Sequence, residues 1–293
     1  MATTELASAD FERSRRASRR RARVGSISRH AVLLAFTVAA LFPIYFMVSS
    51  ALKTNADFAG NQLGLPHTPV FSTIESAISG GSIFRWLTNS LIFTAASVLI
   101  STALAALCAY PLSLMRWRPS RWLLTLMIAL MVIPPIVLIV PLFQMVVELN
   151  QLSTYRSVIV IYTGIMLPFS TFLLVSFFST IPRSLLEAAR IDGASTWRTF
   201  RSIVLPLGAP AIVTVITVQA LWVWNEVLIA VVFLQKESLR TLMVGLTLFN
   251  SRYQVDVPIV MAGMMIGTIP MLLVYLVGQR FFIRGITAGG VKG

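Results

Sequence analysis

Residues 181–206 read IPRSLLEAARIDGASTWRTFRSIVLP, a polar stretch between two long apolar runs. Ser184 followed three residues later by Glu187 matches a capping box, which predicts the start of a helix. Gly193 is predicted to end this helix, because glycine readily takes the positive φ found just beyond helix C-termini. The first half of the stretch is therefore predicted to be a short helix that ends in a bend.

The second half of the stretch predicts another short helix. Ser195 or Thr196 can cap its N-terminus, because both residue types are favoured at that position. The pattern continues to Ile203, and Pro206 is predicted to break the helix before the next apolar run.

The apolar runs on either side of this stretch decide the fold class. The chain has 293 residues, of which 56% are hydrophobic and 12% charged, and its mean hydropathy is +0.80. Soluble domains have about 45–50% apolar and about 25% charged residues. Runs of about 20 apolar residues are long enough to cross the bilayer as helices. They lie at 31–52, 86–114, 122–147, 158–181, 207–234 and 257–282. We therefore expect an all-α integral membrane protein with six transmembrane helices.

The charge distribution predicts the topology. Lys and Arg number 24 against 11 Asp and Glu, a net charge of +13. Counting Lys and Arg in alternate loops favours both termini in the cytoplasm, since these cations are retained on that side. The chain then divides into an Arg-rich tail (1–30), a permease domain (31–283) that includes the segment 182–206, and a C-terminal tail (284–293). The arginines of the first tail lack interleaved aromatic residues, which argues against nucleic-acid binding.

Residues that carry out catalysis or bind metals are missing from the sequence pattern. Cys108 is the sole cysteine, so no disulfide or thiol metal site can form within the chain. His30 and His67 lie far apart, and no paired carboxylates or activated nucleophile occur. A phosphate-binding loop of the type GxxxxGK[ST] is also absent. We expect no catalytic residue, metal or cofactor on this chain, and hence neither a membrane enzyme nor an ATPase.

Segment 182–206 has the composition of a docking element. Its small side chains would let another protein approach closely, and its charged side chains would add directional contacts. The small residues are Ala188, Ala189, Gly193 and Ala194, and the charged ones are Glu187, Arg190 and Asp192. An amphipathic turn resting on the membrane is the alternative. It would explain the arginines but not the Glu-Ala-Ala…Gly spacing.

This pattern resembles a known family signature. Glu187-Ala188-Ala189, Asp192-Gly193-Ala194, Phe200 and the run Ile203-Val204-Leu205-Pro206 are similar to the EAA motif of membrane-spanning subunits of bacterial ABC importers. Further matches are 47–54 (MVSSALKT), Asn89-Ser90, Trp224-Asn225-Glu226 and the ending 279–293. The ending resembles the carbohydrate-uptake branch, in particular the smaller permease of the maltose importer. Val227 departs from that branch, which more often has Phe after Asn-Glu, and this departure leaves the substrate open.

The resemblance implies a division of labour among subunits. It implies a type I ABC importer permease fold whose cytoplasmic coupling helix seats in a cleft of an ABC ATPase dimer, where ATP and Mg would bind. The implied coupling residues are Glu187, Ala188, Ala189, Asp192, Gly193, Ala194, Phe200, Leu205 and Pro206. A homologous second permease and an extracytoplasmic solute-binding protein are the other implied partners, in the bacterial cytoplasmic membrane. The tail from Arg284 resembles one that reaches the ATPase interface, although a frayed end is an alternative.

Span five carries polar side chains that are candidates for a translocation pathway. Gln219, Trp222 and Glu226 are spaced i, i+3 and i+7, which places them on one face of a helix, with Asn225 beside them. Ionisable groups inside a membrane usually face a cavity, and Trp and Gln suit sugar recognition. Alternatively, Glu226 pairs with a neighbouring subunit or with backbone. The outer segments 53–85 and 235–256 are candidate contacts for the binding protein, or solvated loops.

A stand-alone secondary transporter or channel for a polar solute is the competing function. Ion-coupled carriers usually need buried carboxylate or histidine relays, and only Glu226 comes close to one. Six spans are also few for a carrier built from inverted repeats. We therefore expect ATP-driven import of a sugar or oligosaccharide by alternating access, with glycerol phosphate and polyols left as open alternatives.

Overall fold

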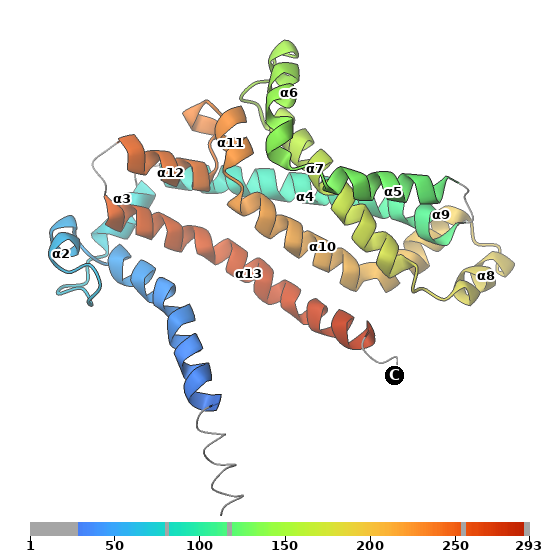
Figure 1. Cartoon of the computed structure of the whole chain (residues 1–293), viewed down its shortest axis with the longest axis horizontal. Helices are drawn as coiled ribbons and strands as arrows, with labels where there is room; N and C mark the ends of the chain where they lie inside the picture. The colour runs from blue at the N-terminus through green and yellow to red at the C-terminus, as the bar shows by residue number, and fades with distance from the viewer. Residues whose placement is uncertain (1–28, 80–81, 116–118, 253–255, 290–293) are drawn as a thin grey trace, which may run out of the picture.

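Long helices run along the main axis of the computed structural model, which describes residues 29–79, 82–115, 119–252 and 256–289 (Figure 1). Five helices in this part of the chain are long and apolar enough to cross a membrane. They are Arg29–Ala51, α4 (Ser82–Leu114), α7 (Tyr155–Phe178), the continuous helix Thr196–Asn225 that contains α10 (Leu205–Asn225), and α13 (Val257–Gly289). A sixth span consists of α5 (Ser120–Met131) and α6 (Pro135–Glu148), and its two halves meet at 96°. The prediction of an all-helical, six-span protein is confirmed.

The predicted third span is the one that departs most from a straight helix. Pro134 lies between α5 and α6 in an extended conformation (φ −63°, ψ 135°), and Pro135 begins α6. A residue that precedes proline is disfavoured in the α region, because its backbone clashes with the proline ring. Two consecutive prolines therefore turn the expected single helix into two.

Helices α4 and α7 form the tightest pair of the bundle. Every fourth residue of α4 is fully buried from position 93 to 109, and these residues are Phe93, Ser97, Ser101, Ala105 and Ala109. The same spacing buries Tyr162, Met166, Ser170, Leu174 and Phe178 on α7. Small side chains at such a stripe let two membrane helices approach closely, and van der Waals packing then stabilises the pair.

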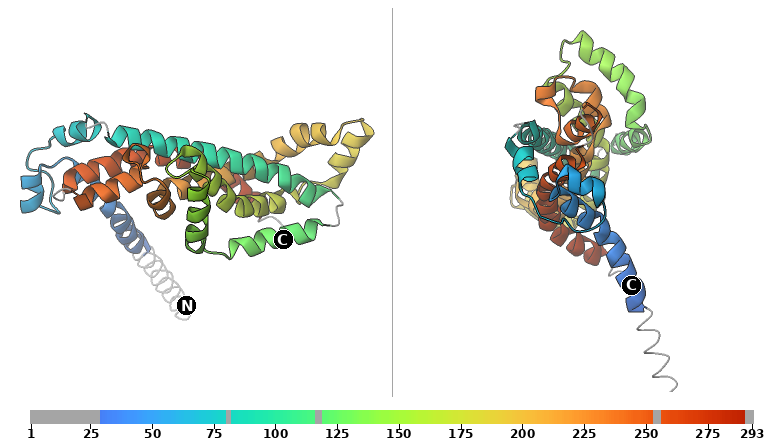
Figure 2. Two further views of the ribbon diagram at one scale, coloured as in Figure 1. Left: turned by 90° about the horizontal axis from the view of Figure 1, so that it is seen from above. Right: turned by 90° about the vertical axis from the view of Figure 1, so that its left-hand side faces the viewer.

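Several short helices lie at the two ends of the bundle (Figures 1 and 2). One end carries α2 (Asn55–Gly60), α3 (Ser72–Ser79), η2 (Glu237–Leu239) and α12 (Leu242–Arg252), and the other end carries α8 (Arg183–Ile191) and α9 (Thr196–Thr199). The segment 235–256 is thus partly a packed helix, since Leu242, Val244 and Leu246 are buried. The predicted inner segment 182–206 thus lies at the opposite end from the described parts of the predicted outer segments 53–85 and 235–256, as a membrane topology requires.

The helix Arg29–Ala51 diverges from the bundle as it approaches its N-terminus (Figure 1). None of the residues in its most apolar window is buried. The predicted tails fall mostly outside the described residues, which exclude 1–28 and 290–293. The backbone of α13 stays helical to Gly289, beyond the predicted end of span six at residue 282.

A glycine on α12 provides a test of the packing at one end of the bundle. A Cβ atom on Gly245 would lie 2.1 Å from Cε3 of Trp86, a buried side chain of α4, whereas a Cβ on Gly60 would meet nothing within 4 Å. We expect Gly245→Ala to destabilise the protein by about 1–3 kcal/mol, because overpacking forces side chains and backbone to shift. Thermal unfolding in detergent would measure this loss, with Gly60→Ala as the matched control. Equal midpoints for the two variants would contradict the packing described here.

Candidate functional site

The inner segment begins with α8, whose N-terminus differs from the prediction. The N-cap residue is Pro182, and no side chain caps the helix, so the predicted capping box of Ser184 and Glu187 is wrong. Pro182 is itself extended (ψ 129°), and the chain enters the helix directly after it. Ser184 therefore lies inside the first turn, too late in the chain to act as N-cap.

The end of α8 agrees with the prediction. Gly193 has a φ of +74°, and its N–H donates to the carbonyl of Arg190 (3.0 Å). The N–H of Ala194 donates to the carbonyl of Ala189 (2.9 Å). These two bonds form a Schellman motif, which fixes the bend. Ser195 then caps α9 by accepting from the N–H of Arg198, as one of the two predicted alternatives required.

The exposed surface of this segment includes most of the predicted coupling residues. Glu187, Ala188, Asp192 and Gly193 are exposed and Ala194 is half-buried, but Ala189 is buried, which contradicts its predicted exposure. Ala189 lies three residues after Leu186, which is also buried, so both belong to the face that packs on the bundle. Exposed apolar side chains also contribute to the surface, and the sequence pattern did not single them out; these are Leu185, Ile191 and Trp197.

Phe200 attaches the segment to the bundle. Its side chain is buried, and its ring lies 5.3 Å from that of Tyr110 on α4 and 5.4 Å from that of Trp197. Residue 200 also starts a π-helical turn, η1 (Phe200–Val204), in which the N–H of Leu205 donates to the carbonyl of Phe200. The phenyl ring therefore anchors the segment from inside rather than lying on its surface.

The helix that follows is continuous, so the predicted break at Pro206 is wrong. One helix of 30 residues runs from Thr196 to Asn225 through η1 and α10. Pro206 is exposed and lies in the first turn of α10, directly after the widened turn, while Leu205 is half-buried. Proline is tolerated at that point, because the π-helical turn that precedes it already departs from the regular i→i−4 hydrogen bonding. The inner segment is thus joined directly to span five.

A cavity of about 640 Å³ lies between α7, α10 and the bent pair α5–α6. Its volume falls in the range of about 300–1,000 Å³ that is usual for small-molecule sites. Most lining side chains are apolar, and Gln219 and Trp222 are also part of the wall. The structure therefore brings two of the four predicted pathway residues to one cavity.

The polar groups of this cavity are few. Nε2 of Gln219 donates to the carbonyl of Met166 (3.2 Å) and to Oγ of Ser170 (3.0 Å), which uses both hydrogens of the amide. Its Oε1 remains as an acceptor. Pro168 cannot donate to the carbonyl of Gly164 four residues earlier, and both residues line the cavity. A ligand would thus meet two acceptors and an indole ring in an apolar surround.

Glu226 does not continue the predicted helical face, because α10 ends at Asn225 and Glu226 is extended. Its carboxylate caps the short helix α11 (Leu228–Phe233) by accepting from the N–H groups of Ile229 (2.8 Å) and Ala230 (3.0 Å). It also accepts a hydrogen bond from the Tyr162 hydroxyl (2.8 Å). The open alternative, in which Glu226 pairs with backbone, is therefore the one found.

Tyr162 connects this interruption to the cavity wall. Its fully buried ring lies edge-to-face against Trp222, with centroids 5.9 Å apart and planes at 83°. Asn225 is exposed, lies outside the cavity lining and donates to the carbonyl of Leu221. Sequence reasoning did not identify Tyr162, although a tyrosine inside an apolar run is a usable signal because a buried hydroxyl needs a partner.

The second halves of the two interrupted spans pack against each other. The rings of Phe143 on α6 and Phe233 on α11 lie 6.0 Å apart. Ser153, which follows α6, donates its N–H to the carbonyl of Phe233 (3.0 Å). Its Oγ accepts from the N–H groups of Gln235 (3.0 Å) and Lys236 (3.3 Å). Both interruptions are thus parts of one connected unit.

Asn89 and Ser90 matched the family motif, but the sequence analysis assigned them no role. In the structure, these two residues of α4 bind the outer segment 238–242. Nδ2 of Asn89 donates to the carbonyls of Ser238 and Arg240 (both 2.9 Å), and its Oδ1 accepts from the Tyr155 hydroxyl. Oγ of Ser90 accepts from the N–H of Leu242 (2.9 Å). These bonds fix the backbone of 238–242 against the bundle.

Comparison with known proteins agrees with this architecture. The family model described as "Binding-protein-dependent transport system inner membrane component" matches residues 101–284. The melibiose/raffinose/stachyose import permease protein of Bacillus subtilis is 33% identical over 94% of this chain and 100% of its own length. The trehalose/maltose transport system permease protein of Thermococcus litoralis is 31% identical over 90% of this chain and 95% of its own.

A solved structure extends the likeness to three dimensions. A chain from a bacterial ABC transporter involved in the import of the acidic polysaccharide alginate has a TM-score of 0.77 and 25% identity, and the match covers 89% of this chain and 97% of that one. The chain described here belongs to the family of binding-protein-dependent transport system inner membrane components.

Proposed function

We propose that this chain is the permease subunit of an ABC importer that moves a sugar or oligosaccharide across the cytoplasmic membrane, driven by ATP hydrolysis in a partner ATPase. The observation that carries this proposal is the cavity beside two interrupted spans, in a chain of this family. Interrupted helices often build transport sites, because their free backbone groups can line a cavity. The names of the relatives, which import melibiose, raffinose, trehalose or maltose, support the substrate class.

The continuous helix Thr196–Asn225 would transmit movement from the inner surface to the cavity. Thirty residues of helix span about 45 Å at 1.5 Å per residue. Its inner end carries α9 beside the bend at Gly193, and further along it carries Gln219 and Trp222, before it ends at the Glu226 interruption. A displacement of α8 would therefore pass through the hydrogen-bonded bend at Gly193 to this helix, and from there to the pathway.

The exposed face of α8 and α9 is the proposed coupling surface for an ABC ATPase dimer, which would hold ATP and Mg. Within the described part of the chain, no ion pair engages Glu187, Arg190 or Asp192, so their charges are free to meet a partner. Ile191 and Trp197 add exposed apolar area to the same surface. This face lies at the end that the charge distribution assigns to the cytoplasm.

Two further partners complete the proposed importer. A homologous second permease would close the pathway on the side that this chain leaves open, where Trp222 is 36% exposed. An extracytoplasmic binding protein would deliver the sugar at the end formed by α2, α3 and α12. A stand-alone ion-coupled carrier is disfavoured, because Glu226, the carboxylate on which it would rely, is engaged by Tyr162 and by α11.

The coupling assignment predicts the effect of a charge at the bend. Gly193→Asp should leave the spans inserted but cause near-complete loss of ATPase co-purification and of uptake, because a charged side chain would occupy the surface where a Cβ now meets nothing. Gly193→Asn is the matched control, since Asn has a similar size and tolerates positive φ without adding charge. Normal uptake and normal ATPase co-purification with the Asp variant would refute the coupling role.

The pathway assignment predicts a substrate-dependent effect for Trp222. Stacking contacts of an aromatic ring are worth about 0.5–1.5 kcal/mol, so Trp222→Ala should raise the half-saturating concentration of loaded binding protein, or lower maximal uptake, by about two- to tenfold. Trp122→Ala is the control, because that ring is 81% exposed on α5 and lies outside the cavity lining. Uptake kinetics that match in the two variants would place Trp222 outside the pathway.

The Tyr162–Glu226 bond predicts a measurable coupling. A hydrogen bond to a carboxylate is worth about 1.5–3 kcal/mol, so Tyr162→Phe should lower the free energy of unfolding by about that amount. Combining it with Glu226→Ala should cost less than the sum of the single changes, because both remove the same bond. Tyr275→Phe, at a tyrosine that is 48% exposed on α13, is the control for thermal unfolding of the assembled transporter. Strict additivity would contradict the bond.

A further inference from the structure

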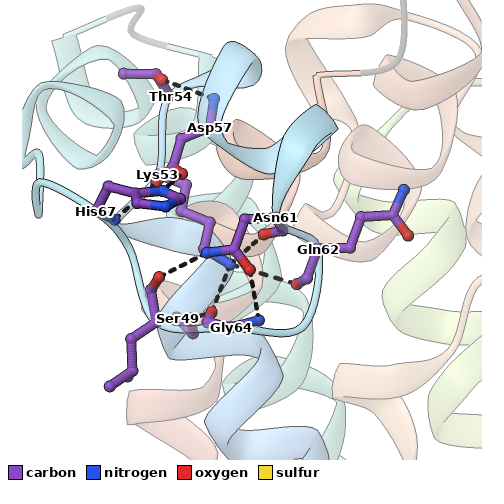
Figure 3. Close-up of polar contacts among 9 residues, drawn as sticks. Ser49, Lys53, Thr54, Asp57, Asn61, Gln62, Gly64 and His67 are labelled. Carbon is purple, nitrogen blue, oxygen red and sulfur yellow. Dashed lines mark hydrogen bonds and ion pairs between the residues drawn. The ribbon is translucent and has the colours of Figure 1, made fainter.

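Residues 61–66, between α2 and α3, form a loop that folds back beside the last turns of the helix Arg29–Ala51 (Figure 3). Oη of Tyr45 donates to the carbonyl of Leu63 (2.9 Å), and Oγ of Ser49 donates to the carbonyl of Gly64 (2.9 Å). Tyr45 lies six residues before the end of that helix, or about 9 Å along its axis. The loop thus lies against the outer end of a membrane span.

Lys53 is fully buried beneath this loop, and no carboxylate forms an ion pair with it within the described residues. Its Nζ donates to the carbonyls of Asn61 (2.7 Å), Gln62 (3.3 Å) and Gly64 (2.7 Å) instead (Figure 3). An ammonium group has three hydrogens, and all three find backbone acceptors here. Lys53 is therefore an internal donor around which the loop is folded.

The remaining carbonyl of the turn is also satisfied by a side chain. Nδ2 of Asn61 donates to the carbonyl of Leu65 (2.8 Å), and its Oδ1 accepts from the N–H of Gly64 (2.8 Å). Each carbonyl from residue 61 to residue 65 thus accepts a hydrogen bond from a side chain. A loop in water has no need of this, because water satisfies its carbonyls, whereas non-helical backbone at membrane depth requires internal partners.

Two of the three exposed side chains of the loop are apolar, and the third is the uncharged Gln62. Leu63 is 61% exposed and Leu65 is 70% exposed, and no residue from 61 to 66 is charged. A mostly apolar cavity of about 550 Å³ lies between Leu65 and Pro66 of the loop and Ile44 and Val48 of the helix, and Leu52 and Pro69 complete its wall. The exposed Phe42 and Ile44 continue this apolar surface along the span.

The chain becomes polar again directly after the loop. The backbone N–H of His67 donates to Oδ2 of Asp57 (3.2 Å), and its Nδ1 pairs with Oδ1 of the same carboxylate (2.5 Å). The hydrogen bond from His67 holds the pKa of Asp57 below its usual value, which keeps the carboxylate charged. His67 is 77% exposed. This pair marks the return of the chain to water.

We propose that residues 61–66 form an interfacial membrane loop, which inserts Leu63 and Leu65 into the outer leaflet of the lipid bilayer while Lys53 satisfies its backbone. Lipid is the occupant that the chemistry favours, since the apolar face is continuous with a span whose apolar surface is itself unburied. The insertion would fix the outer end of the first span at the membrane boundary. This inference does not depend on which solute the protein carries.

The test uses the fact that Cys108 is the sole cysteine. In a Cys108→Ala background, Leu65→Cys is labelled with an environment-sensitive fluorophore, and the assembled transporter is reconstituted into phosphatidylcholine vesicles. The emission should be blue-shifted, quenched by lipids with a nitroxide near the top of the acyl chain, and shielded from aqueous iodide. Ser238→Cys, an exposed position at the same end of the bundle, is the control and should show the opposite pattern.

Two outcomes would overturn the proposal. Quenching of the Leu65 probe by iodide and not by nitroxide lipids would place the loop in water, and shielding from both would show that a protein partner covers it. A second variant tests Lys53 separately. Lys53→Met should shift the emission of the Leu65 probe to the red and open it to iodide, whereas Lys236→Met, at an exposed lysine of the same end, should change neither. If emission and iodide quenching of the Leu65 probe are the same in Lys53→Met, the proposed role of Lys53 in holding the loop is wrong.

Discussion

Backbone polar groups inside a bilayer must find their partners within the protein, and this constraint accounts for two of the turns described here. Where span five breaks at Glu226, the carboxylate accepts from the first free N–H groups of α11 and from the Tyr162 hydroxyl. Where the chain turns beside the first span, Lys53 donates to three carbonyls. Both ionisable side chains therefore complete the hydrogen bonding of the backbone. Under the proposed function, the energy for transport would come from the partner ATPase.

The interruptions are not scattered through the bundle. The breaks after α5 and after α10 lead into α6 and α11, which pack on each other and are joined through Ser153. The unbroken helix Thr196–Asn225 reaches from the inner segment to one of these breaks. The rigid helix Thr196–Asn225 thus leads from the inner segment directly to the unit formed by the two breaks. Under the proposed function, a movement at the inner surface would be carried by the rigid part and absorbed at the break, which is where the cavity lies.

Local patterns in the sequence predicted the spans and the bend at Gly193, because hydropathy and positive φ depend on a few neighbouring residues. Tertiary partners decided the features that the sequence could not predict. Ser184 matched a capping box, yet Pro182 starts the helix earlier. Glu226 had the spacing of a pathway residue, yet a tyrosine 64 residues away and the turn that follows it engage its carboxylate. Asn89 and Ser90 belonged to a recognisable motif, but their role became visible only with the segment 238–242 in place.

The composition of the cavity wall also bears on where specificity resides. A site discriminates strongly among polar ligands when it presents many buried donors and acceptors that the wrong ligand leaves unpaired. The wall built by α7 and α10 offers Oε1 of Gln219, the carbonyl of Gly164 and the indole of Trp222 among apolar side chains. These few groups could contact the apolar face of a sugar ring, but they could not distinguish sugars by the arrangement of their hydroxyl groups. Under the proposed function, recognition of one sugar over another would then depend on surfaces outside this wall, either on the second permease or on the binding protein that delivers the solute.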